Sequence, residues 1–257
     1  MQALIDFDIV AFSMAASAEN DPVEVAYMRI DQMIHSILDT TGANTYRGFI
    51  SGGSNFRHEI YPEYKANRKD MVDPRWRKAC KEYLVREWDA EVTDGYEADD
   101  ALGINQVKTP TYSFGEAYPK REGGIDSPYQ DTIICSIDKD LDMIPGMHYS
   151  WPIVRKGEVV REGKIYEVSE IEGIRSFYKS LLVGDRTDNI FGVYGIGKVK
   201  AAAMIDNLET EEEMFERVAE LYQGDMDRLR INGDCLWIQR QEHQRWSNRD
   251  EFIRMVC

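Results

Sequence analysis

The run DTIICSIDKD, residues 131 to 140, decides the fold that we expect for this chain. Its first part, residues 131 to 137, is short and apolar, which predicts a strand buried on both faces of a sheet. Two carboxylates, Asp138 and Asp140, follow the strand directly. Strands buried on both faces are typical of parallel sheets covered by helices, so the run predicts an α/β fold with acidic residues at the carboxyl end of one strand.

Two further apolar runs extend this sheet towards the amino terminus. ALIDF, residues 3 to 7, and TYRGFIS, residues 45 to 51, both have the length and composition of buried strands. Between them, Asp21 and Pro22 predict the N-cap and first position of a helix. Strand, helix and strand in this order predict a right-handed crossover. The fold class is therefore α/β, with a central, mainly parallel sheet flanked by helices.

The rest of the chain predicts a hairpin and then a helical region. Residues 149 to 166 have the pattern of a β-hairpin that turns at Lys156 and Gly157. Ser169 and Glu172 form a capping box at the start of a helix that runs to about Leu182. Everything after Gly184 is predicted to be helical, with turns near three glycines: Gly195, Gly224 and Gly233.

These elements predict two domains. Residues 1 to 166 form an α/β core, and residues 167 to 257 form a helical region. A helix is expected from Glu97 to about Val107, and the segment 109 to 130, rich in Pro, Gly, Tyr and Ser, predicts an inserted surface loop.

Composition excludes several classes of protein. The 257 residues carry a formal net charge of −15, which disfavours a protein that coats nucleic acid nonspecifically but leaves room for a local basic stripe. The four cysteines show no CxxC spacing, which argues against a zinc site and a disulfide framework. No run has the length of a membrane span and no secretory signal opens the chain, so we expect a cytoplasmic protein without membrane contact.

Carboxylates recur where predicted strands or their following helices meet one edge of the sheet. They are Asp6, Glu97, Asp99, Asp100, Asp138, Asp140, Asp185 and Asp188. Because these positions converge in a parallel sheet, the acids are expected to share one cavity. Oxygen ligands alone suit Mg²⁺ or Mn²⁺, and a pair of such ions is the usual device for phosphodiester hydrolysis. The pattern therefore indicates a candidate two-metal nuclease site.

Each acidic group also has a simpler interpretation. Asp6 and Asp8 could serve as helix caps or turn residues, and the acids from Glu97 to Asp100 could be favoured only by the dipole of a first helical turn. A solvated strand end explains Asp138 and Asp140 about as well. Only their joint placement favours a metal site.

Two stretches of the sequence predict contact with nucleic acid. Residues 61 to 88 are strongly basic and aromatic, and GVYGIGKVK, residues 192 to 200, combines glycines that allow close approach of an anion with a following helix N-terminus. The alternative for the first is a solvated amphipathic helix with Trp76, Tyr83, Leu84 and Trp88 facing a core. The alternative for the second is a plain helix-helix turn.

Five motifs in this order resemble the metal-dependent 5′-nucleases, which include the 5′-nuclease domains of bacterial DNA polymerases, phage 5′→3′ exonucleases and flap endonucleases. They are LIDFD (4 to 8), FRHEIYPEYKANR (56 to 68), YEADDA (96 to 101), CSIDKDLD (135 to 142) and GDRTDNIFGVYGIGKVKAA (184 to 202). The last two motifs are specific, and the similarity spans roughly residues 2 to 205. The short chain is most similar to the phage members, which implies the cytoplasm of a host cell.

The resemblance implies a PIN-like core with a helical arch at residues 61 to 90 and a helix-hairpin-helix-like motif at residues 184 to 205. It implies that the eight carboxylates hold two Mg²⁺ ions, or Mn²⁺, and that K⁺ binds at the hairpin. Tyr64, Lys65 and Arg68 match the "YKxxR" motif, in which the aromatic stacks on a base and the cations contact the scissile phosphate. The implied substrate-binding residues are Arg57, Gly192, Gly195, Gly197, Lys198 and Lys200.

The function that follows from the resemblance is a 5′→3′ exonuclease or flap endonuclease. Its substrate would be DNA with a 5′ flap, a nick or a free 5′ end, with primer RNA on DNA as a further option; protein partners are not indicated. One departure is that Ser51 and Gly52 stand where the family usually has an Asp. A catalytically impaired member that only binds branched DNA is therefore one alternative, and a haloacid-dehalogenase-like phosphatase, which LIDFD imitates, is the other.

Overall fold

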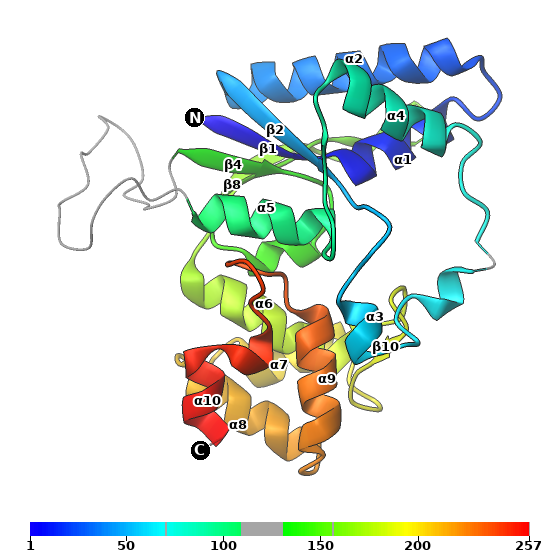
Figure 1. Ribbon diagram of the computed structural model, residues 1–257. Helices are drawn as coiled ribbons and strands as arrows, with labels where there is room; N and C mark the ends of the chain where they lie inside the picture. The colour runs from blue at the N-terminus through cyan, green and yellow to red at the C-terminus, as the bar shows by residue number, and fades with distance from the viewer. Residues whose placement is uncertain (70, 109–130, 156, 257) are drawn as a thin grey trace, which may run out of the picture.

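A six-stranded sheet organises the computed structural model, which describes residues 1–69, 71–108, 131–155 and 157–256 (Figure 1). Along the sheet the strands follow the order β3-β2-β1-β4-β5-β8. Their bounds are β1 Gln2–Asp6, β2 Thr45–Ile50, β3 Glu91–Val92, β4 Thr132–Cys135, β5 Gly146–Ser150 and β8 Lys164–Val168. β1 pairs in parallel with both β2 and β4, and only β8 runs antiparallel to its neighbour. The predicted mainly parallel α/β sheet is confirmed.

Alternate residues of the central strands face two different hydrophobic layers. Ala3 and Ile5 of β1 pack under α1 (Phe7–Ser17), α2 (Val23–Thr41) and α4 (Arg77–Glu87). Leu4, between them, points to the opposite layer, which begins with α5 (Ala98–Val107) and α6 (Glu170–Val183). Since both faces of the strand are buried, its continuous apolar sequence is explained.

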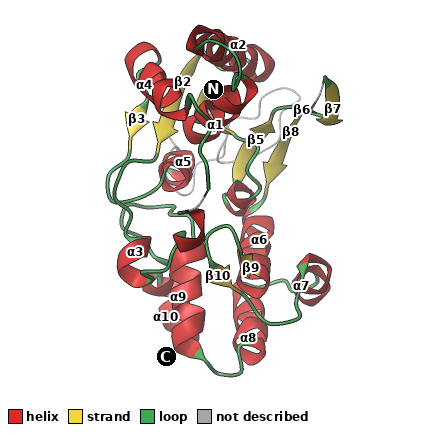
Figure 2. Ribbon diagram, turned by 90° about the vertical axis from the view of Figure 1, so that its right-hand side faces the viewer, coloured by secondary structure: helices red, strands yellow, loops and turns green. Residues whose placement is uncertain are grey.

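The second layer continues into the helical carboxyl-terminal part of the chain, which lies below the sheet in Figure 2. Its helices are α7 Lys198–Ile205, α8 Glu211–Leu221, α9 Met226–Leu236 and α10 Asp250–Val256. One cluster of buried residues includes Leu4 of the sheet, Phe177 of α6 and Trp246. The sheet and these helices therefore share a core, and the domain boundary expected at residue 166 stays a prediction.

The first helix, α1, lies where no helix was predicted. Asp6 ends β1 and is also the N-cap of α1, where its carboxylate accepts a hydrogen bond from the Ile9 amide at 3.0 Å. The next helix, α2, starts at Val23, and its N-cap is Pro22 without a side-chain cap, so Asp21 does not cap it. The capping box of Ser169 and Glu172 on α6 is present as predicted.

Two small antiparallel elements accompany the main sheet, one predicted and one not. The predicted hairpin exists, as strands β6 (Ile153–Arg155) and β7 (Glu158–Arg161). After α6, however, the chain forms a short antiparallel ribbon of β9 (Gly184–Asp185) and β10 (Ile190–Phe191) where only helix was predicted. The loop predicted at 109 to 130 lies outside the described residues. None of the helices that the structure describes is both long and apolar enough to pass through a bilayer.

Gly233 lies within α9 and not in the turn predicted there. A Cβ atom at this position would lie 1.9 Å from the indole ring of Trp246. We expect Gly233→Ala to lower the free energy of unfolding by about 1–3 kcal/mol, because overpacking forces the ring to move. Urea unfolding of this variant beside Gly53→Ala, where a Cβ meets nothing within 4 Å, measures the difference. Equal stabilities would contradict this packing.

Candidate metal and nucleic-acid site

A cleft of about 1440 Å³ lies at the carboxyl ends of the parallel strands. Acidic side chains from five separate segments line it: Asp6, Asp8, Asp73, Glu97, Asp99, Asp138, Asp140, Asp142, Asp185 and Asp188. Seven of the eight predicted ligands are therefore brought together, and Asp100 is not among them. The fold achieves this convergence because β1, β2, β3 and β4 all run in the same direction and end at the same edge.

The floor of the cleft is built by the ends of β1 and β4. The carboxylate of Asp6 accepts a hydrogen bond from the Ser136 hydroxyl at 2.8 Å, and that hydroxyl oxygen accepts one from the Asp138 amide at 3.0 Å. Asp138 in turn accepts a bond from the Asp140 amide at 2.9 Å. Asp6 is thus both a helix cap and a wall of the cleft, so its two interpretations are compatible.

The electrostatics separate the acids into two neighbouring groups. Burial, and then the charge of Asp8, raises the pKa of Asp6 to about 7. Burial, and then Asp6 and Asp138, raises the pKa of Asp99 well above its ordinary value. These residues form the first group together with Glu97, which is a further neighbour of Asp99.

The second group lies around Asp140, on the more open side of the cleft. Although its own surface is partly exposed, desolvation in the cleft raises the pKa of Asp140 to about 7, and the charges of Asp138, Asp185 and Asp188 add to the rise. Asp138 is a neighbour of both groups. Carboxylates crowded in this way are stabilised in their charged form by a nearby cation.

The chemistry of this donor set fits a hard divalent cation. The acidic side chains offer only carboxylate oxygens, the ligands that Mg²⁺ and Mn²⁺ prefer. As the side chains stand, no three His, Cys, Asp or Glu within the described ranges form a group ready to share one ion. Three of the carboxylates, Asp8, Glu97 and Asp188, are instead paired with lysine or arginine side chains from the basic residues 61 to 88.

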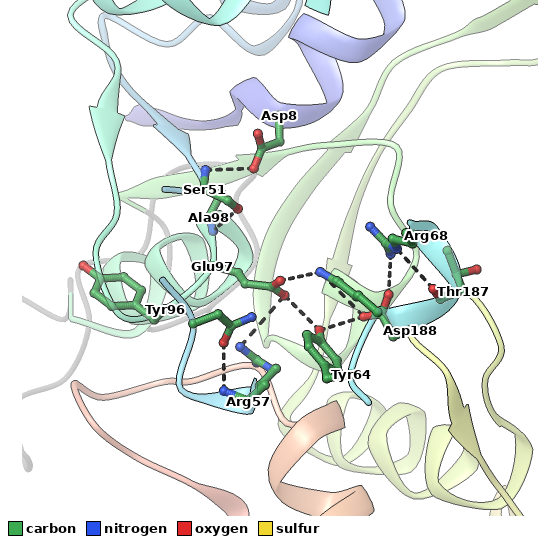
Figure 3. A network of polar contacts seen from close by, with 12 residues as sticks. Asp8, Ser51, Arg57, Tyr64, Arg68, Tyr96, Glu97, Ala98, Thr187 and Asp188 are labelled. Atoms are coloured by element: carbon green, nitrogen blue, oxygen red, sulfur yellow. Dashed lines mark hydrogen bonds and ion pairs between the residues drawn. The ribbon is translucent and has the colours of Figure 1, made fainter. Parts of the chain in front are cut away.

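Lys65 and Arg68 reach into the cleft from the short 3-10 helix η1 (Ala66–Arg68) and its N-cap. The Lys65 ammonium forms an ion pair with Glu97. The Arg68 guanidinium forms one with Asp188 (Figure 3). Burial raises the pKa of Glu97, but Arg57 and Lys65 outweigh it and hold that pKa below the ordinary value. Both predicted catalytic cations therefore lie beside predicted metal ligands.

Asp100 and Arg57 have a different position from the one predicted. Asp100 is fully buried, and both of its oxygens accept bonds from the Arg57 guanidinium, at 2.6 and 2.9 Å. The same carboxylate also accepts bonds from the amides of Glu97 and Gln239, so no oxygen is left for a metal. Arg57 itself is only 3 % exposed and cannot contact DNA from there. The pair joins α3 (Arg57–Ile60) to α5 and to the segment after α9.

Ser51, which stands where the family motif usually has an Asp, contacts the start of α5 and Asp8. The Ser51 hydroxyl oxygen accepts a hydrogen bond from the Ala98 amide at the start of α5, at 2.9 Å. The Ser51 amide donates to Asp8 at 2.8 Å, and Asp8 also pairs with Lys81 of α4. Asp8 therefore lies in the cleft beside the position where the family usually has an Asp. Its own negative charge is already paired with the Lys81 ammonium.

The glycine hairpin borders the same cleft. Gly192 allows the chain to pass close to α6, because a Cβ there would lie 2.3 Å from the Leu182 carbonyl oxygen. Gly195 has a φ of 77°, and Gly197 is the N-cap of α7. Lys198 lines the cleft, while the exposed Lys200 donates to the Gly195 carbonyl at 2.9 Å.

The basic stretch from residue 61 to 90 divides into two parts. Figure 1 shows its first part connecting the helical half of the molecule to the sheet half along one side. Its second part, α4, packs on the sheet through Cys80 and Leu84, with Trp76 and Tyr83 partly buried against the same layer. The amphipathic alternative is thus right for α4, and a helical arch over the whole stretch stays a prediction.

Asp142 and Lys81 are among the cleft residues that the sequence reasoning missed. Asp142, in the motif after β4, lines the cleft and accepts a bond from the Tyr166 hydroxyl at 2.6 Å. Its signal was available, because it continues the spacing of two set by Asp138 and Asp140. Lys81 had no such signal, since only the packing of α4 turns it into the cleft.

Comparison with known proteins gives relatives in sequence and in structure. No protein-family model matches the chain. It is 26% identical over 188 residues to DNA polymerase I of Bacillus caldotenax, which is 67% of this chain but 19% of that protein. It is 27% identical over 194 residues to the 5′-3′ exonuclease of Mycoplasmopsis pulmonis, 74% of this chain and 60% of the relative. The chain thus spans less than two thirds of these relatives.

The structural neighbours include proteins of bacteriophage T5. The T5 flap endonuclease in complex with DNA and metal ions has a TM-score of 0.58 and 18% identity, covering 91% of this chain and 89% of that one. The T5 5′-exonuclease with bound zinc has a TM-score of 0.54 and 19% identity, covering 93% and 99%. The chain therefore has the fold of the T5 5′-exonuclease, and the predicted resemblance to the metal-dependent 5′-nucleases is confirmed.

Proposed function

We propose that this chain is a metal-dependent 5′-nuclease that hydrolyses phosphodiesters at 5′ ends or junctions of DNA and leaves 5′-phosphates. The observation that carries the proposal is the cleft itself, in which acids from five segments lie beside Lys65, Arg68 and the start of α7. The named relatives add support, since they include a 5′-3′ exonuclease and a flap endonuclease solved with DNA.

The two electrostatic groups suggest how the cations would be divided. Asp6, Glu97, Asp99 and Asp138 would hold one Mg²⁺ or Mn²⁺, and Asp140, Asp185 and Asp188 would hold the second. When bound, such ions supply the acidity that makes water a nucleophile and the charge that stabilises the leaving oxygen. The protein's own contribution is to hold these oxygens at one edge of a rigid sheet.

Lys65 and Arg68 would act on the phosphate that is cut. Both side chains lie in the cleft, and the Lys65 ammonium is 3.7 Å from Asp188. Charge fixed beside the reacting phosphate stabilises the transition state more than the ground state. The hairpin would hold the duplex through phosphate contacts, made by the exposed Lys198 and Lys200 and by backbone amides at the N-terminus of α7. K⁺ would bind at the turn of the hairpin.

End-labelled substrates test the proposal directly. The full chain would be incubated with 5′-flap, nicked and RNA-primed duplexes, with Mg²⁺ or with EDTA, and the product lengths read on a gel. We expect Mg²⁺-dependent release of 5′-phosphorylated products; their lengths distinguish exonucleolytic from endonucleolytic cutting. A protein that binds flap DNA equally well with and without Mg²⁺ but never cuts it would contradict the proposal, as would release of phosphate from small esters alone.

Lys65→Ala is expected to slow the single-turnover cleavage rate by ~10²-fold or more, because it removes positive charge from the transition state. Binding of the same flap DNA in Ca²⁺ should change little. Lys69→Ala is the matched control, since this exposed lysine does not line the cleft. A loss of affinity with an unchanged cleavage rate would show that Lys65 only binds the substrate.

A further inference from the structure

The basic segment is joined to the β9-β10 ribbon by main-chain contacts as well as by ion pairs. The Lys65 amide donates to the Asp188 carbonyl at 3.0 Å, and the Asn189 side chain donates to the Glu63 carbonyl at 3.0 Å. Lys65 and Asn189 both have left-handed backbone angles, with φ of 57° and 62°. Asn tolerates this conformation but Lys rarely adopts it, so the left-handed Lys65 together with these hydrogen bonds indicates that the two segments form one unit.

Tyr64 lies at the centre of this unit and is 2 % exposed. Its ring packs with Ile190 and Cys235, and its edge contacts His58 at a centroid distance of 5.5 Å. A base that stacks on an aromatic side chain needs an open ring face. The enclosed ring of Tyr64 offers none, so the stacking role expected from the motif does not fit this position.

The hydroxyl of Tyr64, in contrast, is directed at two carboxylates that line the acidic cleft. It donates to the Asp188 carboxylate at 2.7 Å and lies 3.1 Å from an oxygen of Glu97 (Figure 3). These carboxylates come from two separate segments that line the cleft, the start of α5 and the turn between β9 and β10. A phenol has one proton for two acceptors, and Lys65 supplies the remaining donors because its ammonium reaches both acids.

We propose that Tyr64 is a positioning residue whose buried hydroxyl holds Glu97 and Asp188 at a fixed separation across the cleft, ready to receive divalent cations. The proposal rests on the proposed function for the identity of these cations. Groups that orient metal ligands commonly contribute 10-fold to 100-fold in metal affinity. The contribution of Tyr64 therefore belongs to metal binding and not to recognition of a base.

Tyr64→Phe tests this assignment, because it removes the hydroxyl and keeps the ring. Tyr61→Phe is the matched control: its hydroxyl contacts the exposed Glu63 at 3.2 Å and not the cleft acids. Mn²⁺ affinity would be measured by titration calorimetry on the full chain without DNA, and unfolding of each variant by urea. We expect Tyr64→Phe to weaken Mn²⁺ binding by about 10-fold and Tyr61→Phe to leave it unchanged.

The other outcomes overturn the assignment. Wild-type Mn²⁺ affinity in Tyr64→Phe, with or without a loss of stability, would show that the hydroxyl has no positioning role. Weaker flap-DNA binding in EDTA for Tyr64→Leu, with normal binding for Tyr64→Phe and unchanged Mn²⁺ affinity in both, would restore base stacking. The Mn²⁺ measurement needs no turnover. If Tyr64→Phe weakens Mn²⁺ binding but the unmodified chain cuts no DNA, the proposed function is refuted and the positioning role of Tyr64 stands.

Discussion

Replacing Asp138 by Asn is expected to lower cleavage of flap DNA by about 10³-fold or more, while the protein stays folded and binds the DNA. The change keeps the size and the hydrogen-bonding geometry of the side chain but removes one negative charge. Asp138 is the carboxylate that neighbours both acidic groups of the cleft, so its charge contributes to both cation positions. Metal ions supply several kcal/mol to such reactions, and each 1.36 kcal/mol is a factor of ten in rate.

Asp131→Asn is the matched control for this prediction. Asp131 directly precedes β4, at the amino end of the strand that Asp138 follows. Its carbonyl accepts a hydrogen bond from the Gln2 amide. Single-turnover rates of both variants in Mg²⁺ and their flap-DNA affinities in Ca²⁺ would be compared with the unmodified chain. Turnover of Asp138→Asn at the wild-type rate would refute the site, and equal losses in both variants would point to a general effect of charge.

Replacing Arg57 by Met is expected to lower the free energy of unfolding by about 3–5 kcal/mol. The buried guanidinium pairs with Asp100 and donates to the carbonyls of Cys235 and Trp237, each at 2.8 Å. Without it, Asp100 would remain charged in the core with no cation, which is the costly half of a buried ion pair. Urea unfolding followed by circular dichroism measures the change.

The exposed pair of Arg47 and Glu91 is the control for this stability prediction. Arg47→Met should cost about 1 kcal/mol or less, because solvent screens a surface ion pair. The double variant Arg57→Met with Asp100→Leu should recover part of the loss: it leaves no unpaired charge, but the amides of Glu97 and Gln239 lose their acceptor. Similar small losses for Arg57→Met and Arg47→Met would contradict the buried network.

The sequence was sufficient for those features that depend on local pattern. Residues 131 to 137 contain a short apolar run, and the carboxylates after it mark a strand end, so both the parallel sheet and its acidic edge follow from neighbouring residues. The helix α1 was missed because it starts directly from β1, with Asp6 serving as strand end and cap at once. Its sequence also continues the apolar run without an amphipathic break.

Features that depend on contacts between distant residues were not predictable in the same way. Asp99 and Asp100 are adjacent and alike in the sequence. Only the fold places Asp100 against Arg57 and Asp99 in the cleft. Tyr64, among cations, has the local character of an exposed aromatic, yet the ribbon and α9 enclose it. Gly233 is read as a turn until Trp246, 13 residues later, is seen to occupy the space of its missing side chain.

The central claim is that acids gathered at the carboxyl edge of the sheet hold divalent cations beside Lys65 and Arg68. Anomalous scattering from crystals grown with Mn²⁺ tests it most directly. We expect manganese peaks inside the cleft, beside Asp138, and none at Asp100. Manganese bound only outside the cleft, or a cleft without a peak in crystals of a chain that cuts DNA in Mn²⁺, would contradict the account.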